Sequence, residues 1–276
     1  MEITVLIDNC PCPDFPALMS EHGLSLFIEY SGKRILCDMG ASRKFHANAD
    51  ILGKDLNTVD FAFVSHAHVD HTGGLRHFLE TVPDKRVYIS SRAFSSRYYS
   101  YSHAHRHSLS PDYSILDEFT GRFSFVDDSM WISPDIAVVS CRDNSCLRPY
   151  ANSLLFAEND GTEHPDDFSH ELSLAFRSPD GLVIVSSCSH CGAVNIMQSC
   201  CRFTGESHVH AFIGGLHLVD NARSSDELAV FSDEINRFFP DVRIITGHCT
   251  GSSARSQLPL SVHSAEIFHT GSVFSL

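Results

Sequence analysis

The sequence has no long apolar run and few basic residues. No stretch approaches the length of about 20 residues that a membrane-spanning helix needs, so we expect no membrane association. Against 34 Asp and Glu there are only 20 Lys and Arg, which gives a formal net charge of −14. This balance argues against the overall electrostatic footprint of a nucleic-acid-binding protein. We therefore expect a small-molecule substrate and no nucleic-acid partner, and a homo-oligomer remains an open alternative.

Low-complexity segments and repeats are also absent, as is a secretory pattern at the start of the sequence. Residues 1–8 contain an early acidic residue and resemble a strand, so we expect a cytoplasmic protein. The ten cysteines are not spaced like a small secreted disulfide framework, so we expect mostly free thiols. With 276 residues and 43% hydrophobic content, the chain can bury a sizeable core.

Strand-like apolar segments alternate with helical segments along the chain. Strands are predicted at residues 3–8, 24–30, 33–38, 60–64, 86–89, 123–126, 135–140, 153–158, 172–177, 182–187, 209–213 and 242–246. Helices are predicted at residues 43–52, 73–81 and 192–201, and from a capping box at 224–227 to Pro240. We expect segments 153–158 and 172–177 to pair as strands, with a turn at 159–161. The alternation indicates the α/β class, with helices outside two central sheets.

Residues 90–122 break this alternation with a locally basic and aromatic segment. We interpret it as an insertion over the site, in which Arg97 and Arg106 would bind an anionic or ring-bearing substrate. A solvated connection without a role is the alternative. The alternating His103, His105 and His107 are expected in a flexible polar loop rather than in a second metal site.

Three histidines and one aspartate lie within six residues, as His66, His68, Asp70 and His71. They follow an apolar strand-like run and precede a Gly-Gly pair that opens a helical segment. On an extended segment His66 and His68 point the same way, and Asp70 and His71 can face the same pocket from the turn. A histidine-rich surface loop does not explain this strand-to-helix setting. The cluster therefore predicts a metal site, with zinc favoured and manganese, iron or magnesium as alternatives.

The pattern His66-x-His68-x-Asp70-His71 resembles the signature of the metallo-β-lactamase superfamily. The resemblance implies an αββα sandwich that forms a single domain over residues 1–276 and holds one or two metal ions. The chain is most similar to the branch with the dihydropterin–ribofuranosylaminobenzene phosphate synthase of methanopterin biosynthesis. The sequence segments that carry this closer similarity are residues 21–25, 169–171, 188–190, 214–218 and 247–251.

The resemblance also implies a set of metal ligands. One ion would be bound by His66, His68 and His170, and a second ion by Asp70, His71 and His248. The superfamily often has Gly-Asp where this chain has Cys188, with His190 two residues later. Either residue could be a shared or adjacent ligand, because a thiolate is an adequate zinc ligand. A buried structural cysteine is the alternative for Cys188.

Three further residues stand near these motifs. Asp38 is either a partner that orients a ligand histidine or an ordinary turn acid. His22 is expected near the site but not as a metal ligand. His217 follows a Gly-Gly pair and either contacts substrate or is structural.

Two chemistries fit such a ligand set, and both imply an enzyme. In hydrolysis, the metal lowers the pKa of water and Asp70 orients the nucleophile toward a carbonyl or phosphorus centre. In the transfer that the closer resemblance implies, the metal binds a phosphate or diphosphate leaving group while an aryl group attacks a pterin methylene. A binding or sensor protein that has lost turnover is a third alternative. We expect hydrolysis of a small anionic or phosphorylated substrate.

Overall fold

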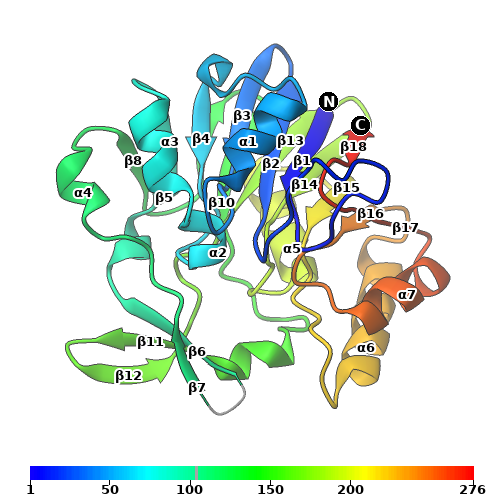
Figure 1. The fold of residues 1–276 in the computed structure, drawn as a ribbon. Coiled ribbons are helices and arrows are strands. Elements are labelled where there is room, and N and C mark those ends of the chain that lie inside the picture. Colours follow the sequence, from blue (N-terminus) through cyan, green and yellow to red (C-terminus); the bar gives the residue numbers. More distant parts are fainter. Residues whose placement is uncertain (103–104) are drawn as a thin grey trace. The chain divides into compact units, whose positions relative to one another are not determined.

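The computed structural model describes residues 1–102 and 105–276, so His103 lies outside the described residues. The described chain forms two compact units. Unit 1 comprises residues 1–127, 156–164 and 268–276, and unit 2 comprises residues 128–155 and 165–267. Each unit contains a seven-stranded sheet (Figure 1). That the whole chain acts as one domain stays a prediction.

The large sheet of unit 1 has the strand order β18-β1-β2-β3-β4-β5-β8. Its strands are β1 (Glu2–Ile7), β2 (Ser25–Tyr30), β3 (Lys33–Cys37), β4 (Phe61–Phe63), β5 (Arg86–Ser90), β8 (Phe123–Val126) and β18 (Val273–Ser275). The helices of this unit are α1 (Lys44–Ile51), α2 (Val69–Thr72), α3 (Leu75–Thr81) and α4 (Ile115–Glu118), with 3-10 turns at Leu56–Thr58 and Ser91–Phe94. Strands β3, β4, β5 and β8 run parallel, so their carboxyl ends meet at one edge of the sheet.

Helix α1 packs on this sheet through one buried side, which carries Phe45, Asn48 and Ala49. These positions are three and four residues apart, which places them on the same face of a helix. The Asn48 amide also donates to the carbonyl oxygens of Leu6 (2.7 Å) and Met19 (2.7 Å). The predicted helix at residues 43–52 is therefore confirmed, and a buried amide fixes its position.

A four-stranded sheet of order β12-β11-β6-β7 interrupts the α/β alternation. Its strands are β6 (Arg97–Ser102), β7 (His105–Ser108), β11 (Leu155–Asn159) and β12 (Thr162–Pro165). The predicted pairing of segments 153–158 and 172–177 is wrong, because β11 neighbours β12 and β6 instead. His105 and His107 lie in β7 rather than in the polar loop that we expected.

The large sheet of unit 2 has the strand order β17-β16-β15-β14-β13-β10-β9. Its strands are β9 (Met130–Ser133), β10 (Ile136–Ser140), β13 (Leu172–Ser178), β14 (Gly181–Val185), β15 (Val209–Gly214), β16 (Arg243–Thr246) and β17 (Ser264–Ile267). The helices of unit 2 are α5 (Ala193–Thr204), α6 (Ser224–Phe238) and α7 (Ser252–Ser261), with a 3-10 turn at Tyr150–Leu154. Strand β14 is central and buried, as predicted.

The structure settles two further details of the sequence interpretation. The predicted capping box at the start of α6 does not form, because Arg223 occupies the N-cap position and makes no side-chain capping bond. The Ser224 hydroxyl instead accepts from the backbone N–H of Asn221 at 2.7 Å. No disulfide joins any of the ten cysteines, all of which lie in the described part of the chain.

Gly214, at the end of β15, holds the backbones of two strand ends in close contact. Its φ is +142°, and a Cβ added there would lie 1.7 Å from the carbonyl oxygen of Ser186. We expect Gly214→Ala to lower the free energy of unfolding by about 3 kcal/mol or more, since two backbones must separate. The control Gly121→Ala has φ +82° and no atom within 4 Å. It should cost only about 1–2 kcal/mol in urea titrations, and equal losses would contradict the packing argument.

Candidate metal centre

The unit 1 half-site consists of His66, His68, Asp70 and His71, which follow β4. Three of these residues present neighbouring buried imidazole rings. The His66 ring centroid lies 4.7 Å from that of His68 and 4.3 Å from that of His71. Asp70 joins the group, with its Oδ2 3.4 Å from His71 Nε2. The four residues that the sequence placed on a strand-to-helix turn are thus gathered in unit 1.

Asp38 supports this half-site from the end of the neighbouring parallel strand β3. Its Oδ2 lies 2.8 Å from His71 Nδ1 and accepts from the Ser65 hydroxyl at 2.7 Å, while Oδ1 accepts from the Ser65 backbone N–H at 2.7 Å. The Ser65 hydroxyl in turn lies 2.9 Å from His66 Nδ1. Of the two roles open to Asp38, the structure shows the partner that orients a histidine rather than a solvent-facing turn acid.

Two carboxylates, those of Asp70 and Asp38, surround the buried His71 imidazole. Burial lowers the pKa of this imidazole, but the nearby Asp70 and Asp38 carboxylates outweigh burial and raise the pKa to about 10. The two carboxylates therefore stabilise a positive charge at a position with no solvent exposure. A buried place that favours positive charge between carboxylates suits a metal cation as well as a proton.

The loop before β2 also contacts Asp70. His22 Nε2 lies 3.6 Å from Asp70 Oδ2, and the side chain of His22 is 72% exposed. The Leu24 backbone N–H donates to the Asp70 carbonyl oxygen at 3.3 Å. A Cβ on Gly23 would lie 2.6 Å from the same oxygen. His22 is thus adjacent to the half-site through Asp70, where the sequence interpretation put it.

The segment 90–122 reaches the same histidines within unit 1. The Tyr98 ring centroid lies 6.0 Å from that of His68, and the Leu109 carbonyl oxygen accepts from the Val69 backbone N–H at 2.8 Å. The Arg97 side chain is exposed and donates no hydrogen bond to any described residue. The Arg106 guanidinium, by contrast, lies 3.4 Å from the Tyr99 ring centroid and pairs with Glu158 and Glu163.

The unit 2 half-site consists of His170, Cys188, His190 and His248, all buried. Cys188 and His190 follow β14 and His248 follows β16, so these residues lie beyond the carboxyl ends of parallel strands. His170 precedes β13. Because β13 is antiparallel to β14, β13 starts at the edge where β14 ends. Ligands of open α/β sheets bind at such edges. The topology of unit 2 thus gathers these four residues at one end of its sheet.

Hydrogen bonds tie the loops at this edge together. The Gly215 backbone N–H donates to the Ser187 carbonyl oxygen at 2.8 Å, and the Ser189 hydroxyl donates to the Gly215 carbonyl oxygen at 2.6 Å. The Leu216 backbone N–H donates to the Thr250 hydroxyl at 3.0 Å. The loops that carry Cys188, His217 and His248 are therefore fixed to one another.

The His190 ring is held by residues that the sequence interpretation missed. It stacks on Phe168, with centroids 4.5 Å apart and an angle of 6°, and lies 4.3 Å from the His217 ring. Its Nδ1 is 3.1 Å from Asn152 Oδ1, and its backbone N–H donates to Glu171 at 2.7 Å. Glu171 lies in segment 169–171, whose family resemblance was the one signal in the sequence for these contacts. Asn152 and Phe168 had no local pattern.

Asp166 is a further residue that the sequence interpretation did not assign to the site. Its Oδ2 lies 3.2 Å from His170 Nε2, and both side chains are buried. The carboxylate is four residues before the histidine in an acidic loop, which is only a weak signal in the sequence. A carboxylate beside a ligand histidine is a common way to fix the ring.

Left-handed backbone conformations concentrate at the two half-sites. Of the eight non-glycine residues with positive φ in the described part of the chain, five lie at the half-sites: Asp38 (+57°), Phe168 (+57°), Ser189 (+61°), His217 (+51°) and His248 (+48°). Such conformations cost energy for residues other than glycine and cluster at functional sites. The donor set fits a divalent metal, because it combines imidazoles, carboxylates and a thiol with carboxylates that orient the rings.

Comparison with known proteins agrees with this arrangement. Residues 21–137 match the family model of the metallo-β-lactamase superfamily. Over this segment the chain is similar to the domain of that superfamily. It is also 27% identical over 251 residues to the 7,8-dihydropterin-6-methyl-4-(β-D-ribofuranosyl)-aminobenzene-5'-phosphate synthase of Methanocaldococcus jannaschii. That alignment covers 86% of this chain and 83% of the synthase.

Solved structures confirm the metallo-β-lactamase fold. The crystal structure of Tm1679, a metal-dependent hydrolase of the β-lactamase superfamily, is similar with a TM-score of 0.84 and 26% identity, over 100% of this chain and 99% of that chain. Zn²⁺-bound PqqB from Methylobacterium extorquens is similar in fold alone, with a TM-score of 0.57 and 12% identity over 100% of both chains. The α/β class predicted from the sequence is therefore confirmed. Within the described residues, no helix combines the length and apolar character needed to cross a membrane.

Proposed function

We propose that this metallo-β-lactamase-fold protein is a metal-dependent hydrolase of a small anionic or phosphorylated substrate. The observation that carries the proposal is the buried grouping of His66, His68 and His71 with Asp70, supported by Asp38. The similarity to Tm1679, whose description is a metal-dependent hydrolase, supports the same reaction class.

We further propose that residues of both half-sites serve as ligands. His66, His68 and His170 would bind one ion; Asp70, His71 and His248 would bind a second; and Cys188 or His190 would be shared or adjacent. Zinc suits these nitrogen, oxygen and sulfur donors best, with manganese, iron or magnesium as alternatives. The carboxylates of Asp38 and Asp166 would orient His71 and His170 respectively.

A divalent ion held there would supply a Lewis acid that polarises a carbonyl or phosphoryl group and acidifies water. The catalytic role of Asp70 would be to orient the nucleophile through its carboxylate. Asp38 would keep His71 in the tautomer that carries its hydrogen on Nδ1. His217, whose ring lies 4.3 Å from that of His190, would contact the substrate beside the ligands.

Group transfer is the second candidate. The observation that favours it is the 27% identity, over 86% of this chain, to the synthase of Methanocaldococcus jannaschii. The same Lewis-acid neutralisation of phosphate oxygens serves transfer and hydrolysis, so the ligands do not discriminate between them. The nucleophile is the difference: water in hydrolysis, and an aryl group in transfer.

Product analysis in H₂¹⁸O separates these functions. Anaerobically purified, metal-loaded protein would be incubated with phosphodiesters, lactones, thioesters and a pterin diphosphate plus an aryl phosphate acceptor. Hydrolysis predicts ¹⁸O in one product, and transfer predicts a coupled product without ¹⁸O. If the protein retains its metal and turns over none of these substrate classes, the proposed hydrolase is contradicted and a binding role is favoured.

The two arginines of segment 90–122 should differ in their effect on substrate binding. Because the Arg97 guanidinium has no hydrogen-bonding partner among the described residues, we expect Arg97→Ala to raise KM for an anionic substrate about 10-fold. Arg106→Ala should raise KM less, since Glu158 and Glu163 already compensate the Arg106 charge. Steady-state kinetics on both variants test this. An unchanged KM for Arg97→Ala with every phosphorylated substrate would exclude its binding role.

A further inference from the structure

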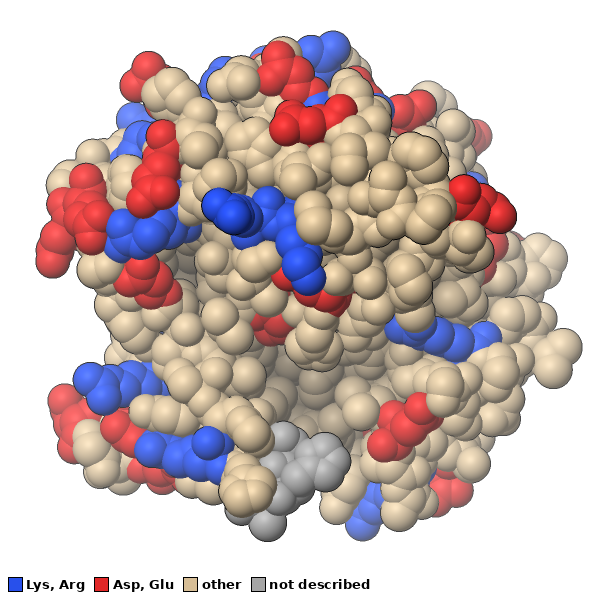
Figure 2. Space-filling model, in the orientation of Figure 1, with Lys and Arg blue, Asp and Glu red and all other residues tan. Residues whose placement is uncertain are grey.

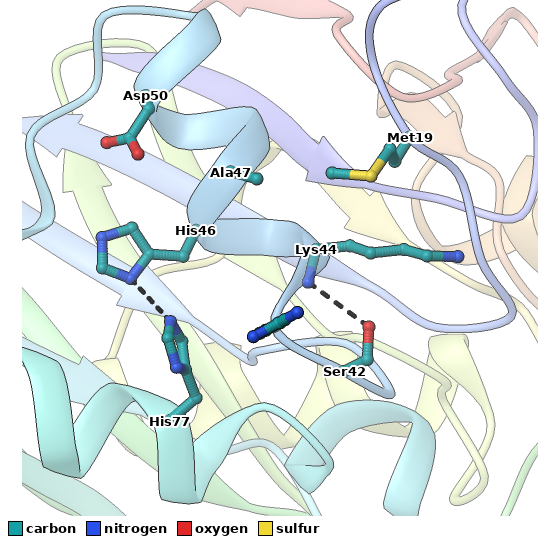
Figure 3. A pocket seen from close by; sticks show the side chains of 8 residues that line it. Met19, Ser42, Lys44, His46, Ala47, Asp50 and His77 are labelled. Atoms are coloured by element: carbon teal, nitrogen blue, oxygen red, sulfur yellow. Dashed lines mark hydrogen bonds between the residues drawn. The ribbon is translucent and has the colours of Figure 1, made fainter.

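A pocket lies in unit 1, beside α1 and α3, and contains none of the half-site residues (Figure 3). Its volume is about 720 Å³. Four of its lining residues are basic, namely Arg43, Lys44, His46 and His77. The carboxylate among the lining residues is Asp50, one helical turn after His46. These basic side chains gather in a chain whose formal net charge is −14.

Two imidazoles form the floor of this pocket. His46 on α1 and His77 on α3 point toward one another (Figure 3), with His46 Nδ1 3.1 Å from His77 Nε2. Such a bond needs one N–H and one lone pair, so the other nitrogen of each ring is left to interact with a ligand. Burial lowers the pKa of His77, and the positive charges of His46 and Arg43 lower it further. The cationic form of His77 is thereby disfavoured, so the positive charge of this pocket comes chiefly from Arg43 and Lys44.

Arg43 supplies a charge that the protein does not compensate. Its side chain is exposed, and no described residue accepts a hydrogen bond from its guanidinium. The Lys44 ammonium is partly compensated, because it donates to the Ser20 carbonyl oxygen at 3.1 Å and lies 3.7 Å from Glu21 Oε2. Figure 2 shows basic side chains gathered on this face where α1 begins. A guanidinium without a carboxylate partner is suited to a planar or tetrahedral oxyanion.

The positive end of α1 does not by itself make this a site. The Lys44 backbone N–H, the first of the helix, already donates to the Ser42 hydroxyl at 3.3 Å. Glu21 accepts from the backbone N–H groups of Ala41 (3.0 Å) and Ser42 (2.9 Å), just before the helix. Side chains must therefore hold any ligand. A divalent cation is disfavoured, because the charges of Arg43 and Lys44 lie beside the two imidazoles that would bind it.

We propose that this pocket binds the phosphate group of a small molecule through Arg43, His46 and His77. The guanidinium would form charge-assisted bonds to two phosphate oxygens. With both rings neutral, the ring that accepts the His46–His77 bond carries its hydrogen on the outward nitrogen, and this N–H would donate to a third oxygen. Asp50 would keep the anion on the side of Arg43. The site is separate from the proposed metal centre and does not depend on the proposed reaction.

The test is a titration of the zinc-loaded protein with inorganic phosphate, followed by ¹H–¹⁵N NMR of the histidine rings. His46→Gln and His77→Gln assign the two signals. We expect both signals to shift and saturate. The same response is expected in His68→Ala, because phosphate bound at the metal centre would not shift the His46 and His77 signals. Arg43→Ala should weaken the binding about 10-fold, as loss of a charged hydrogen bond does.

The matched control is Arg86→Ala, another exposed arginine of unit 1 without a hydrogen-bonding partner among the described residues. It should leave the phosphate titration unchanged. Three results would overturn the proposal: no shift of the His46 and His77 signals, equal binding by Arg43→Ala and the parent protein, or a response of these rings to added Zn²⁺ but not to phosphate.

Discussion

Replacing His68 by alanine is expected to lower bound metal and catalytic activity together. His68 is buried, and its ring centroid lies 4.7 Å from that of His66, so the substitution removes one donor from the middle of the unit 1 half-site. Removing a partner that only orients a ligand typically costs 10–100-fold in affinity, so losing a ligand should cost about 100-fold or more. Metal per chain, measured by plasma mass spectrometry after dialysis, and turnover on the same sample give the result.

The fold should survive the loss of His68, because the surrounding sheet does not depend on it. Circular dichroism of the variant should therefore match that of the parent protein. His107→Ala is the matched control, since His107 is an exposed histidine of β7 in the same unit. It should keep full metal content and activity. Unchanged metal content in His68→Ala would show that the ligand assignment is wrong.

Asp38→Asn should weaken metal binding about 10–100-fold while keeping the backbone in place. The Asp38 carboxylate accepts from three donors, on Ser65 and His71. An amide can satisfy only part of this set, because its NH₂ group would face a donor. His71 would then turn its hydrogen to Nε2 and lose the lone pair with which it would bind metal. Asparagine tolerates the φ of +57° at this position, so backbone strain is not the cause.

A competition titration with a zinc chelator measures the affinity of this variant. Asp84→Asn is the control, because Asp84 also has a positive φ (+64°) and is exposed. We expect Asp84→Asn to bind zinc like the parent protein. Equal affinity of Asp38→Asn and the parent would mean that Asp38 does not orient His71 for a metal.

The grouping of His66, His68, Asp70 and His71 can be predicted from the sequence because these residues are local. The apolar run, the alternating His66 and His68 and the following helix lie within one short segment, where side-chain periodicity decides direction. Asp38 could be placed near them only because parallel strands end at the same edge. The resemblance then supplied His170 and His248, which no periodicity in the sequence connects to the motif.

Residues that act through long-range packing could not be predicted. Asn152 and Phe168 contact His190 from segments far away in the sequence, and neither belongs to a motif. Asp166 contacts His170 across one turn of an irregular loop, which has no defined side-chain direction. Such positions follow from tertiary structure alone.

The missed strands have a different physical cause. Strand β12 is exposed along all four residues, so it shows no alternation between buried and exposed positions. The sequence predicts the turn at residues 159–161, but the segment after it is polar, so the pattern favours pairing with the next apolar run instead. Helix α7 contains Pro259, which disfavours a helix prediction.

The central claim is that residues of both half-sites bind the same metal centre. A crystal structure of the anaerobically purified protein, with anomalous maps recorded at the zinc, iron and manganese edges, tests it most directly. The account predicts one or two anomalous peaks at bonding distance, about 2.0–2.3 Å, from atoms of His66, His68, His71, His170 and His248. Density at Cys188 or His190 would identify the shared ligand. Metal-replete crystals with no peak near these histidines, or with His170 and His248 remote from it, would contradict the account.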